Sequence, residues 1–282
     1  MGIRTLPTDV IINTIKEMCI QANLCLGEDM QQALLAAKGN EESKLGQIVL
    51  EQLKKNLEIA EEETIPICQD TGMAIVFLEI GQDVHISGMQ IEDAVNEGIR
   101  RGYQEGYLRK SVVEDPLNRI NTKDNTPGVI HYSIIPGDRI RITVAPKGFG
   151  SENMSKVYML KPADGREGVM AAVLDSVKKA GPNACPPMVV GVGIGGSFEK
   201  CTLLAKKALI RKLSIRNPIP EIAQMEKELL QEINCLGIGP AGLGGTTTAL
   251  GVNIETYPTH IAGLPVAVNL CCHVNRHVVR VL

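Results

Sequence analysis

The chain has 282 residues, of which 44% are hydrophobic, enough to bury the core of one large domain or two modest ones. Its 29 basic and 32 acidic residues are interspersed and give a formal net charge of -3, so no summed field favours nucleic acid or an anionic membrane. No apolar run approaches the roughly 18 residues of a membrane span, and the charged N-terminal segment lacks the core of a signal peptide. We therefore expect a soluble, cytoplasmic protein that neither binds nucleic acid nor crosses a membrane.

The first part of the chain, residues 1–64, is predicted to be a helical lead-in. Apolar residues recur at helical spacing from residue 8 to about residue 21, from 29 to 37 and from 41 to 62. The remaining residues, 65–282, are expected to contain sheets. The predicted fold class is therefore mixed α/β (α+β).

The segment Ile65-Pro66-Ile67-Cys68-Gln69-Asp70-Thr71-Gly72 places a thiol, an amide, a carboxylate and a hydroxyl on one predicted turn. The apolar run 73–80 follows at once and predicts a strand, so the turn lies where loops carry functional residues on a rigid scaffold. A lone cysteine near a glycine is usually a small buried residue. A function for Cys68 therefore depends on partners elsewhere in the chain.

The middle of the chain changes from a helical to an alternating pattern. A helix is predicted over 90–107, and the polar loop 121–128 is long enough to be either a binding loop or a mobile one. Alternation over 129–135 and 139–145, joined by Pro136-Gly137-Asp138, predicts an antiparallel hairpin. The following glycines at 148 and 150 would let a backbone approach a ligand and expose amide donors.

The second half of the chain is predicted to alternate between helices and strands. The helices are expected over 165–180, 197–212 and 220–235, and the strands over 188–192, 249–255 and 264–270. The run 191–196 formally matches the dinucleotide-binding pattern GxGxxG, but the ribose-binding acid expected about 20 residues later is missing. Tight glycine packing or a carboxylate-binding nest is therefore favoured over a dinucleotide site.

The eight cysteines include no CxxC pair, which removes zinc ribbons, thioredoxin-like redox pairs and the ferredoxin spacing. Cys68, Cys185 and either Cys271 or Cys272 instead share a position at a predicted strand–loop junction. Three thiolates would leave one iron of a cubane cluster open to water or substrate, which suits a Lewis acid better than an electron carrier. The alternative is that all three are buried small residues, since a sequence does not show convergence in space.

Six segments together resemble the iron-sulfur hydro-lyase family, which contains class I fumarases and L-tartrate dehydratases. They are 68–72, 121–128, 147–153, 185–187 with 191–196, 242–248 and 259–272. The resemblance covers essentially the whole chain in order and implies that 65–282 is a hydro-lyase catalytic region, with the whole chain one catalytic unit whose loops converge on a [4Fe-4S] cluster.

The resemblance also implies a partner. In single-chain class I fumarases a smaller C-terminal domain follows, whereas this chain stops ten residues after Cys272. We therefore expect the alpha subunit of the two-subunit type, a beta subunit that carries the C-terminal domain, and a dimer of alpha–beta pairs. The family's remaining carboxylate-binding and proton-abstracting residues lie in that C-terminal domain.

The family's functional residues map onto positions of this chain. The cluster ligands fall on Cys68, Cys185 and Cys272, with Cys271 as the alternative to Cys272. The positions that contact the dicarboxylate substrate match Gln69, Asp70, Arg109, Gly148, Gly150 and His260. Among these, Asp70 and His260 are expected to be catalytic.

The chemistry agrees with these roles. Dehydration of a 2-hydroxy dicarboxylate removes a weakly acidic C3 proton and expels hydroxide, and an iron that binds the C2 hydroxyl and a carboxylate oxygen would stabilise both developing charges. Asp70 and His260 would order or shuttle the proton of the departing water, while Arg109 and backbone amides would hold a carboxylate.

The expected reaction is the reversible hydration of fumarate to (S)-malate, a step of the tricarboxylic acid cycle. The enzymatic alternative is L-tartrate dehydratase, which converts tartrate to oxaloacetate. Two alternatives from other classes are a non-catalytic iron-sulfur or zinc-binding subunit and a nucleotide-binding protein built on residues 191–196.

Overall fold

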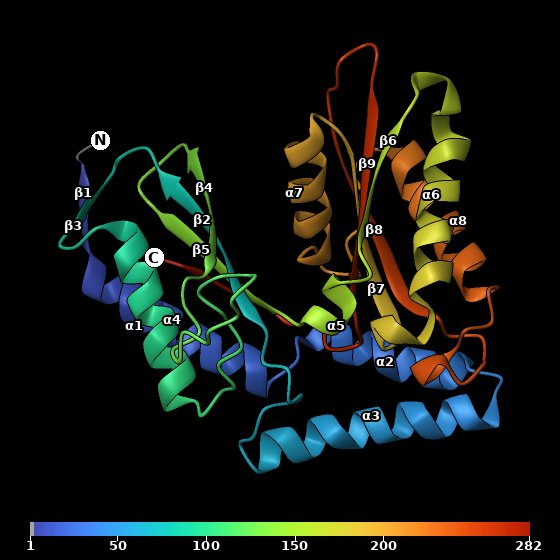
Figure 1. Cartoon of the computed structure of the whole chain (residues 1–282), viewed down its shortest axis with the longest axis horizontal. Coiled ribbons are helices and arrows are strands. Elements are labelled where there is room, and N and C mark those ends of the chain that lie inside the picture. The colour runs from blue at the N-terminus through green and yellow to red at the C-terminus, as the bar shows by residue number, and fades with distance from the viewer. Residues whose placement is uncertain (1–2) are drawn as a thin grey trace. The chain divides into compact units, whose positions relative to one another are not determined.

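The computed structural model describes residues 3–282, which form two compact units. Unit 1 consists of Met1–Gly27, Leu57–Phe149 and Arg276–Leu282, and unit 2 consists of Glu28–Asn56 and Gly150–Asn275. Each unit combines helices with a mixed sheet (Figure 1), which confirms the predicted mixed α/β class and the helical start of the chain. The N-terminal helices are divided between the units, because α1 belongs to unit 1 and α2 to unit 2.

Unit 1 is built on a mixed sheet with the strand order β10-β5-β2-β4. Its strands are β2 (Met73–Gly81), β4 (Val129–Ile135), β5 (Ile140–Lys147) and β10 (Val278–Val281), accompanied by a short parallel pair, β1 (Arg4–Pro7) and β3 (Val84–Ser87). Helices α1 (Thr8–Leu24) and α4 (Ile91–Glu105) pack against each other. Gly98 permits this close approach, because a Cβ there would lie 2.8 Å from the Ile12 carbonyl oxygen.

The predicted antiparallel hairpin in this unit is wrong, although both of its strands form. β4 pairs in parallel with β2, β5 pairs with β2 in the antiparallel sense, and β2 therefore lies between them. The segment after β2 also bonds to the connecting turn, because the Asp83 N–H donates to the Gly137 carbonyl at 2.9 Å. Alternation and turn residues predict two local strands, but they carry no information about a third strand that pairs with both of them.

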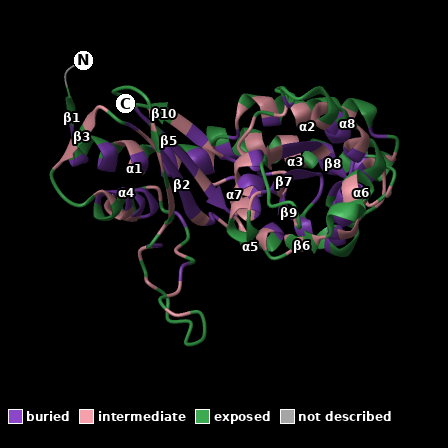
Figure 2. Cartoon of the chain, turned by 90° about the horizontal axis from the view of Figure 1, so that it is seen from above, coloured by how far each residue is buried: buried purple, intermediate pink, exposed green. Residues whose placement is uncertain are grey.

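Unit 2 has a mixed sheet with the strand order β6-β9-β7-β8. The strands are β6 (Lys156–Leu160), β7 (Met188–Gly195), β8 (Ala249–Tyr257) and β9 (Leu264–Cys271). Helix α7 (Phe198–Leu209) covers one face, and α6 (Gly165–Ala180) and α8 (Pro220–Asn234) cover the other (Figure 1). Burial on both faces explains the near-continuous apolar runs of β7 and β9, whose residues are mostly inaccessible to solvent (Figure 2).

The remaining helices are α2 (Glu28–Asn40), α3 (Lys44–Glu62) and the short α5 (Phe149–Glu152). Helix α2 contacts β8 of unit 2. Across residues 3–282, none of the helices combines the length and the apolarity that crossing a membrane requires.

The glycines of residues 191–196 allow close helix–strand packing. A Cβ at Gly193 would lie 2.0 Å from the Cys201 carbonyl oxygen of α7, and one at Gly191 would lie 2.3 Å from the Ala205 carbonyl oxygen. A side chain at either position would push α7 off the sheet. Packing therefore accounts for two of the glycines that produce the GxGxxG match.

Candidate active site

The Cys68 turn, residues 68–72, leads into β2 of unit 1. The Asp70 N–H donates to Cys68 Sγ at 3.4 Å, and the Gly72 N–H donates to Asp70 Oδ1 at 3.0 Å. The second carboxylate oxygen, Asp70 Oδ2, accepts the Phe149 N–H at 2.9 Å. The Cys68 side chain is half-buried and that of Gln69 is exposed. Asp70 therefore holds the turn against the end of β5, while its neighbours stay accessible.

Two other predicted substrate residues lie beside this turn. A Cβ at Gly148 would lie 3.0 Å from Asp70 Oδ2, so a side chain at this position would crowd the carboxylate. The Arg109 carbonyl accepts the Thr71 hydroxyl at 2.9 Å, and the Arg109 side chain is exposed. Unit 1 therefore brings Arg109 and Gly148 to the Cys68 turn. Gly150 is the first residue of the second segment of unit 2.

Asn125, in the loop 121–128, connects the Cys68 turn to the segment that carries Arg109. Its side chain is completely buried; the amide nitrogen donates to the Gly72 carbonyl at 3.1 Å, and the amide oxygen accepts the Ser111 N–H at 2.6 Å. Asn125 also has a positive φ of 64°, a conformation that Asn tolerates better than most residues. Sequence reasoning singled out this loop as a binding or mobile segment, and the structure shows Asn125 in it as a brace.

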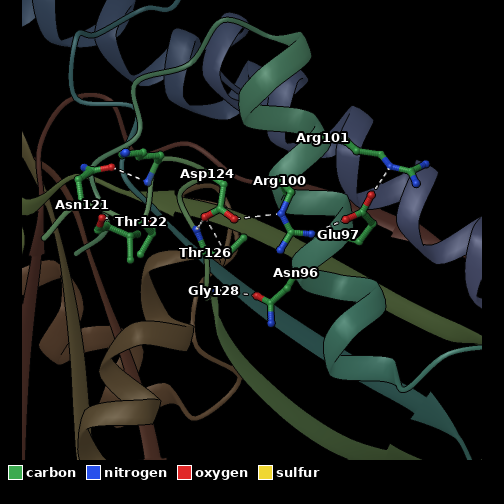
Figure 3. Close-up of polar contacts among 11 residues, drawn as sticks. Asn96, Glu97, Arg100, Arg101, Asn121, Thr122, Asp124, Thr126 and Gly128 are labelled. Carbon is green, nitrogen blue, oxygen red and sulfur yellow. Dashed lines mark hydrogen bonds and ion pairs between the residues drawn. The ribbon is translucent and has the colours of Figure 1, made fainter. Parts of the chain in front are cut away.

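Helix α4 anchors the same loop (Figure 3). Arg100 Nε donates to Asp124 Oδ2 at 2.9 Å, and Asn96 Oδ1 accepts the Gly128 N–H at 2.9 Å. Burial alone would raise the pKa of Asp124, but hydrogen bonds from Thr126 and the Arg100 guanidinium lower it below its usual value. The ionised carboxylate therefore fixes the loop to the helix near neutral pH.

Replacing Asn125 with alanine should destabilise unit 1. The Asn125→Ala variant removes one of the two hydrogen bonds to the buried Gly72 carbonyl, leaves the Ser111 N–H without its partner and places alanine in a left-handed conformation, so we expect a loss of about 2–4 kcal/mol in the free energy of unfolding. Urea unfolding measures this loss. The matched control Asn118→Ala, at an exposed position, should change the free energy by less than about 0.5 kcal/mol. Equal unfolding midpoints for the two variants would contradict the bracing role.

Cys185 and Cys272 lie on adjacent turns of unit 2. The His273 N–H donates to the Cys185 carbonyl at 3.4 Å, and His273 Nδ1 lies 3.1 Å from the same oxygen. A carbonyl oxygen only accepts, so Nδ1 carries a proton. Cys185 is exposed and has a φ of 52°, a left-handed conformation that is uncommon for a residue with a Cβ and is concentrated at functional sites.

The structure separates the two candidates for the third ligand. Cys271 is the last residue of β9, pairs with Val189 of β7 and is only 4% exposed. Cys272 is the first residue beyond the strand and is half-buried. Successive side chains along a strand point to opposite faces, so the two thiols differ in direction as well as in burial. The accessible thiol, beside the turn of Cys185, is that of Cys272.

The cysteine thiols fit an iron-sulfur cluster chemically. Cys68 belongs to unit 1, and Cys185 and Cys272 belong to unit 2. All three are at least partly accessible at the ends of strands, and Cys68 Sγ accepts a backbone N–H of the kind that stabilises thiolate ligands. Inside each unit, the described residues contain no group of three or more His, Cys, Asp and Glu side chains arranged around a metal position.

His260 lies at the other end of the unit 2 sheet from Cys185 and Cys272. It precedes β9 in a loop that bonds to the end of β7, where the Thr259 hydroxyl donates to the Gly196 carbonyl at 2.9 Å. Because β9 spans Leu264–Cys271, the two ends of the sheet are roughly 25 Å apart. The structure therefore does not bring His260 to these cysteines within one chain.

The His260 ring has a defined tautomer. Its Nδ1 accepts the Ala262 N–H at 3.2 Å, so Nε2 carries the proton of the neutral ring. The ring lines a mainly apolar pocket of about 460 Å³ that also includes Arg166, Ile222 and Met225. His260 thus presents an N–H donor from an exposed loop.

Sequence reasoning missed Glu41, which supports the turn of Cys185. The residue is 2% exposed, and its carboxylate accepts the N–H groups of Thr246 at 2.9 Å and Thr247 at 2.7 Å. Burial alone would raise the pKa of Glu41, but these and other hydrogen bonds lower it. The glycine-rich segment held in this way bonds to the turn, because the Ala241 N–H donates to the Pro186 carbonyl at 2.9 Å. A glutamate just before a helix carries no sequence signal for such a role.

Comparison with known proteins identifies the family of the chain. The family model described as Fumarate hydratase (Fumerase) matches residues 12–281. A protein of Methanocaldococcus jannaschii named "Putative L(+)-tartrate dehydratase subunit alpha" is 43% identical over 279 residues, which are 97% of this chain and 96% of that protein. Proteins of Escherichia coli K12 and Shigella sonnei named "L(+)-tartrate dehydratase subunit alpha" are each 33% identical over 253 residues, 88% of this chain and 83% of theirs.

These matches define the chain as a subunit from the iron-sulfur hydro-lyase family. It belongs to the fumarate hydratase (fumerase) family and corresponds to the alpha subunit. The match includes all the residues for which ligand and substrate roles are predicted. The resemblance found in the sequence is therefore confirmed.

Proposed function

We propose that this chain is the alpha subunit of a class I fumarate hydratase, which interconverts fumarate and (S)-malate. The observation that best supports this reaction is the Cys68 turn, which Arg109 contacts through its backbone carbonyl and Gly148 borders at the Asp70 carboxylate, in a chain that matches the fumarate hydratase family model. L(+)-tartrate dehydratase is the second candidate, and the names of the relatives favour it.

The proposed cofactor is a [4Fe-4S] cluster ligated by Cys68, Cys185 and Cys272. Their accessibility and their places at strand ends support this set, and the burial of Cys271 supports Cys272 as the third ligand. When bound, such a cluster supplies an iron without a protein ligand, which acts as a Lewis acid toward a substrate hydroxyl and carboxylate.

The side chains of unit 1 would bind and orient the dicarboxylate. The exposed Arg109 guanidinium suits bidentate binding of a carboxylate, and the exposed Gln69 amide offers both a donor and an acceptor. Each oxygen of Asp70 already accepts one backbone N–H, and the lone pairs left over would order a substrate hydroxyl or the departing water. Gly148 and Gly150 would let the backbone approach the substrate closely.

The proposed catalytic role of His260 requires a second alpha subunit. Because β9 separates His260 from Cys185 and Cys272 of its own chain, the ring would serve the cluster of a second alpha subunit. This condition agrees with a dimer of alpha–beta pairs. There, the Nε2–H would donate a hydrogen bond that orders the departing water. We further propose that the complex is cytoplasmic and that the beta subunit carries the remaining carboxylate-binding residues and the base.

Steady-state assays of the chain, alone and with its beta subunit, test the proposed function. The alpha chain alone should be nearly inactive, and the complex should hydrate fumarate with a kcat/KM at least about 10-fold above that for dehydration of tartrate, since (S)-malate, the product of the hydration, and tartrate differ by a hydroxyl group. A preference for tartrate would select the second candidate. Full turnover by the alpha chain alone would contradict the two-subunit assembly.

A further inference from the structure

Three buried side chains hold three consecutive carbonyls of the Cys68 turn. The donors are the Tyr103 hydroxyl, the Asn125 amide and the Arg276 guanidinium, and the acceptors are the carbonyls of Asp70, Thr71 and Gly72. Tyr103 donates at 2.7 Å to Thr71 and lies 3.0 Å from the Gly72 oxygen, while Arg276 Nη2 donates to Asp70. The carbonyls therefore face buried donors, and the Asp70 N–H is directed to the Cys68 sulfur.

Arg276 differs from the other two donors because it is charged. Its side chain is 4% exposed, and its protein partners are backbone carbonyls, those of Asp70 and of Pro146 at 3.4 Å from Nε. The remaining nitrogen, Nη1, is buried and has no hydrogen-bond partner among residues 3–282. No ion pair involves Arg276 in this described range. The guanidinium is thus a buried cation that makes no direct ion pair within this range, although the Asp70 carboxylate belongs to the residue whose carbonyl it binds.

An uncompensated buried charge is costly, and two carbonyl dipoles offset only part of its desolvation. A compensating anion is therefore expected beside it. The position indicates which anion: the bonded carbonyl lies two residues after Cys68, and Arg276 itself lies four residues after Cys272. Cys68 and Cys272 are both proposed thiolate ligands. A cluster with three thiolate ligands carries a net negative charge.

We propose that Arg276 is a positioning residue of the iron-sulfur site, whose guanidinium fixes the Asp70 carbonyl and supplies the buried positive charge that balances the thiolate-ligated cluster. The inference rests on the proposed function. Two consequences follow. Loss of the charge lowers the reduction potential of the cluster, because a nearby cation favours the more negative, reduced state. It also destabilises the cluster-loaded protein more than the cluster-free protein, because the cation and the cluster stabilise each other.

The test compares Arg276→Met, which removes the charge, with Arg276→Lys, which keeps it. Arg280→Met is the matched control, because Arg280 lies on β10 of the same unit with an exposed side chain. Anaerobic redox titration of each alpha–beta complex gives the midpoint potential of the cluster. Melting curves are recorded with the cluster and after its removal.

We expect Arg276→Met to lower the midpoint potential, to slow cluster reconstitution about 10-fold and to lower the melting temperature more with the cluster than without it. The lysine variant should keep a potential close to that of the wild type, and Arg280→Met should match the wild type in every measurement. An unchanged potential in an Arg276→Met complex that contains the cluster would overturn this inference alone, as would equal losses of stability with and without the cluster. Absence of an iron-sulfur spectrum from the wild-type complex would contradict the proposed function itself.

Discussion

The Cys68→Ala variant of the alpha–beta complex should lose its iron-sulfur absorption and its hydratase activity together. Cys68 is the proposed ligand from unit 1, and its sulfur accepts the Asp70 N–H in the turn that carries Gln69 and Asp70. A Lewis-acid metal contributes several kcal/mol of transition-state stabilisation, so activity should fall by about 10³-fold or more. Absorption spectra and iron analysis after anaerobic reconstitution measure the first effect, and steady-state rates the second.

The control for this variant is Cys25→Ser, in the same unit. Cys25 is exposed, and partial desolvation together with the Glu61 carboxylate raises the pKa of its thiol, which favours the protonated form. Its replacement should leave the iron content and the activity unchanged. Unchanged cluster content in Cys68→Ala would contradict the proposal that Cys68 is a ligand of the cluster.

Mixed complexes should show that His260 acts on the cluster of a second alpha subunit. Complexes with only His260→Ala chains, or with only Cys185→Ser chains, should be inactive. A complex that contains one chain of each kind should regain about half of the wild-type sites, because the intact His260 of the Cys185→Ser chain reaches the cluster of the other chain. Differently tagged alpha chains allow this mixed complex to be purified and assayed.

One control complex shows that mixed assembly itself preserves activity. A complex of His260→Ala and wild-type chains, which keeps one intact ring and both clusters, should also retain about half of the sites. If His260 acts within its own chain, the mixed complex of the two variants stays as inactive as its parents, since neither chain then holds an intact site. That result would remove His260 from the proposed mechanism, given the separation along β9.

Local periodicity predicted most elements of the fold. The helical spacing after residue 8, the apolar run after Gly72 and the amphipathic segment 165–180 correspond to α1, β2 and α6. Pairing between strands was not predictable in the same way, as the position of β2 between β4 and β5 shows. The short strands β3, β6 and β10 were not predicted, because a few residues are too few to show the alternation of apolar and polar side chains that indicates a strand.

From the sequence, only those residues of the candidate site that lie in a recognisable motif could be predicted. The run CQDTG and its resemblance to a family pointed to Cys68 and Asp70, and the structure places Arg109 and Gly148 beside them. Arg276 had no such signal, because a basic residue near the end of a chain is usually solvated. Its burial against the Asp70 carbonyl is a tertiary property. The same holds for the separation of His260 from Cys272, which depends on the direction of β9.

Chemical analysis of the anaerobically purified alpha–beta complex shows whether the three cysteines hold a [4Fe-4S] cluster that performs the reaction. We expect about four irons and four inorganic sulfides per alpha chain, an iron-sulfur absorption band, and loss of hydration activity when the iron is removed. Zinc without sulfide, or full hydration of fumarate by metal-free protein, would contradict this expectation.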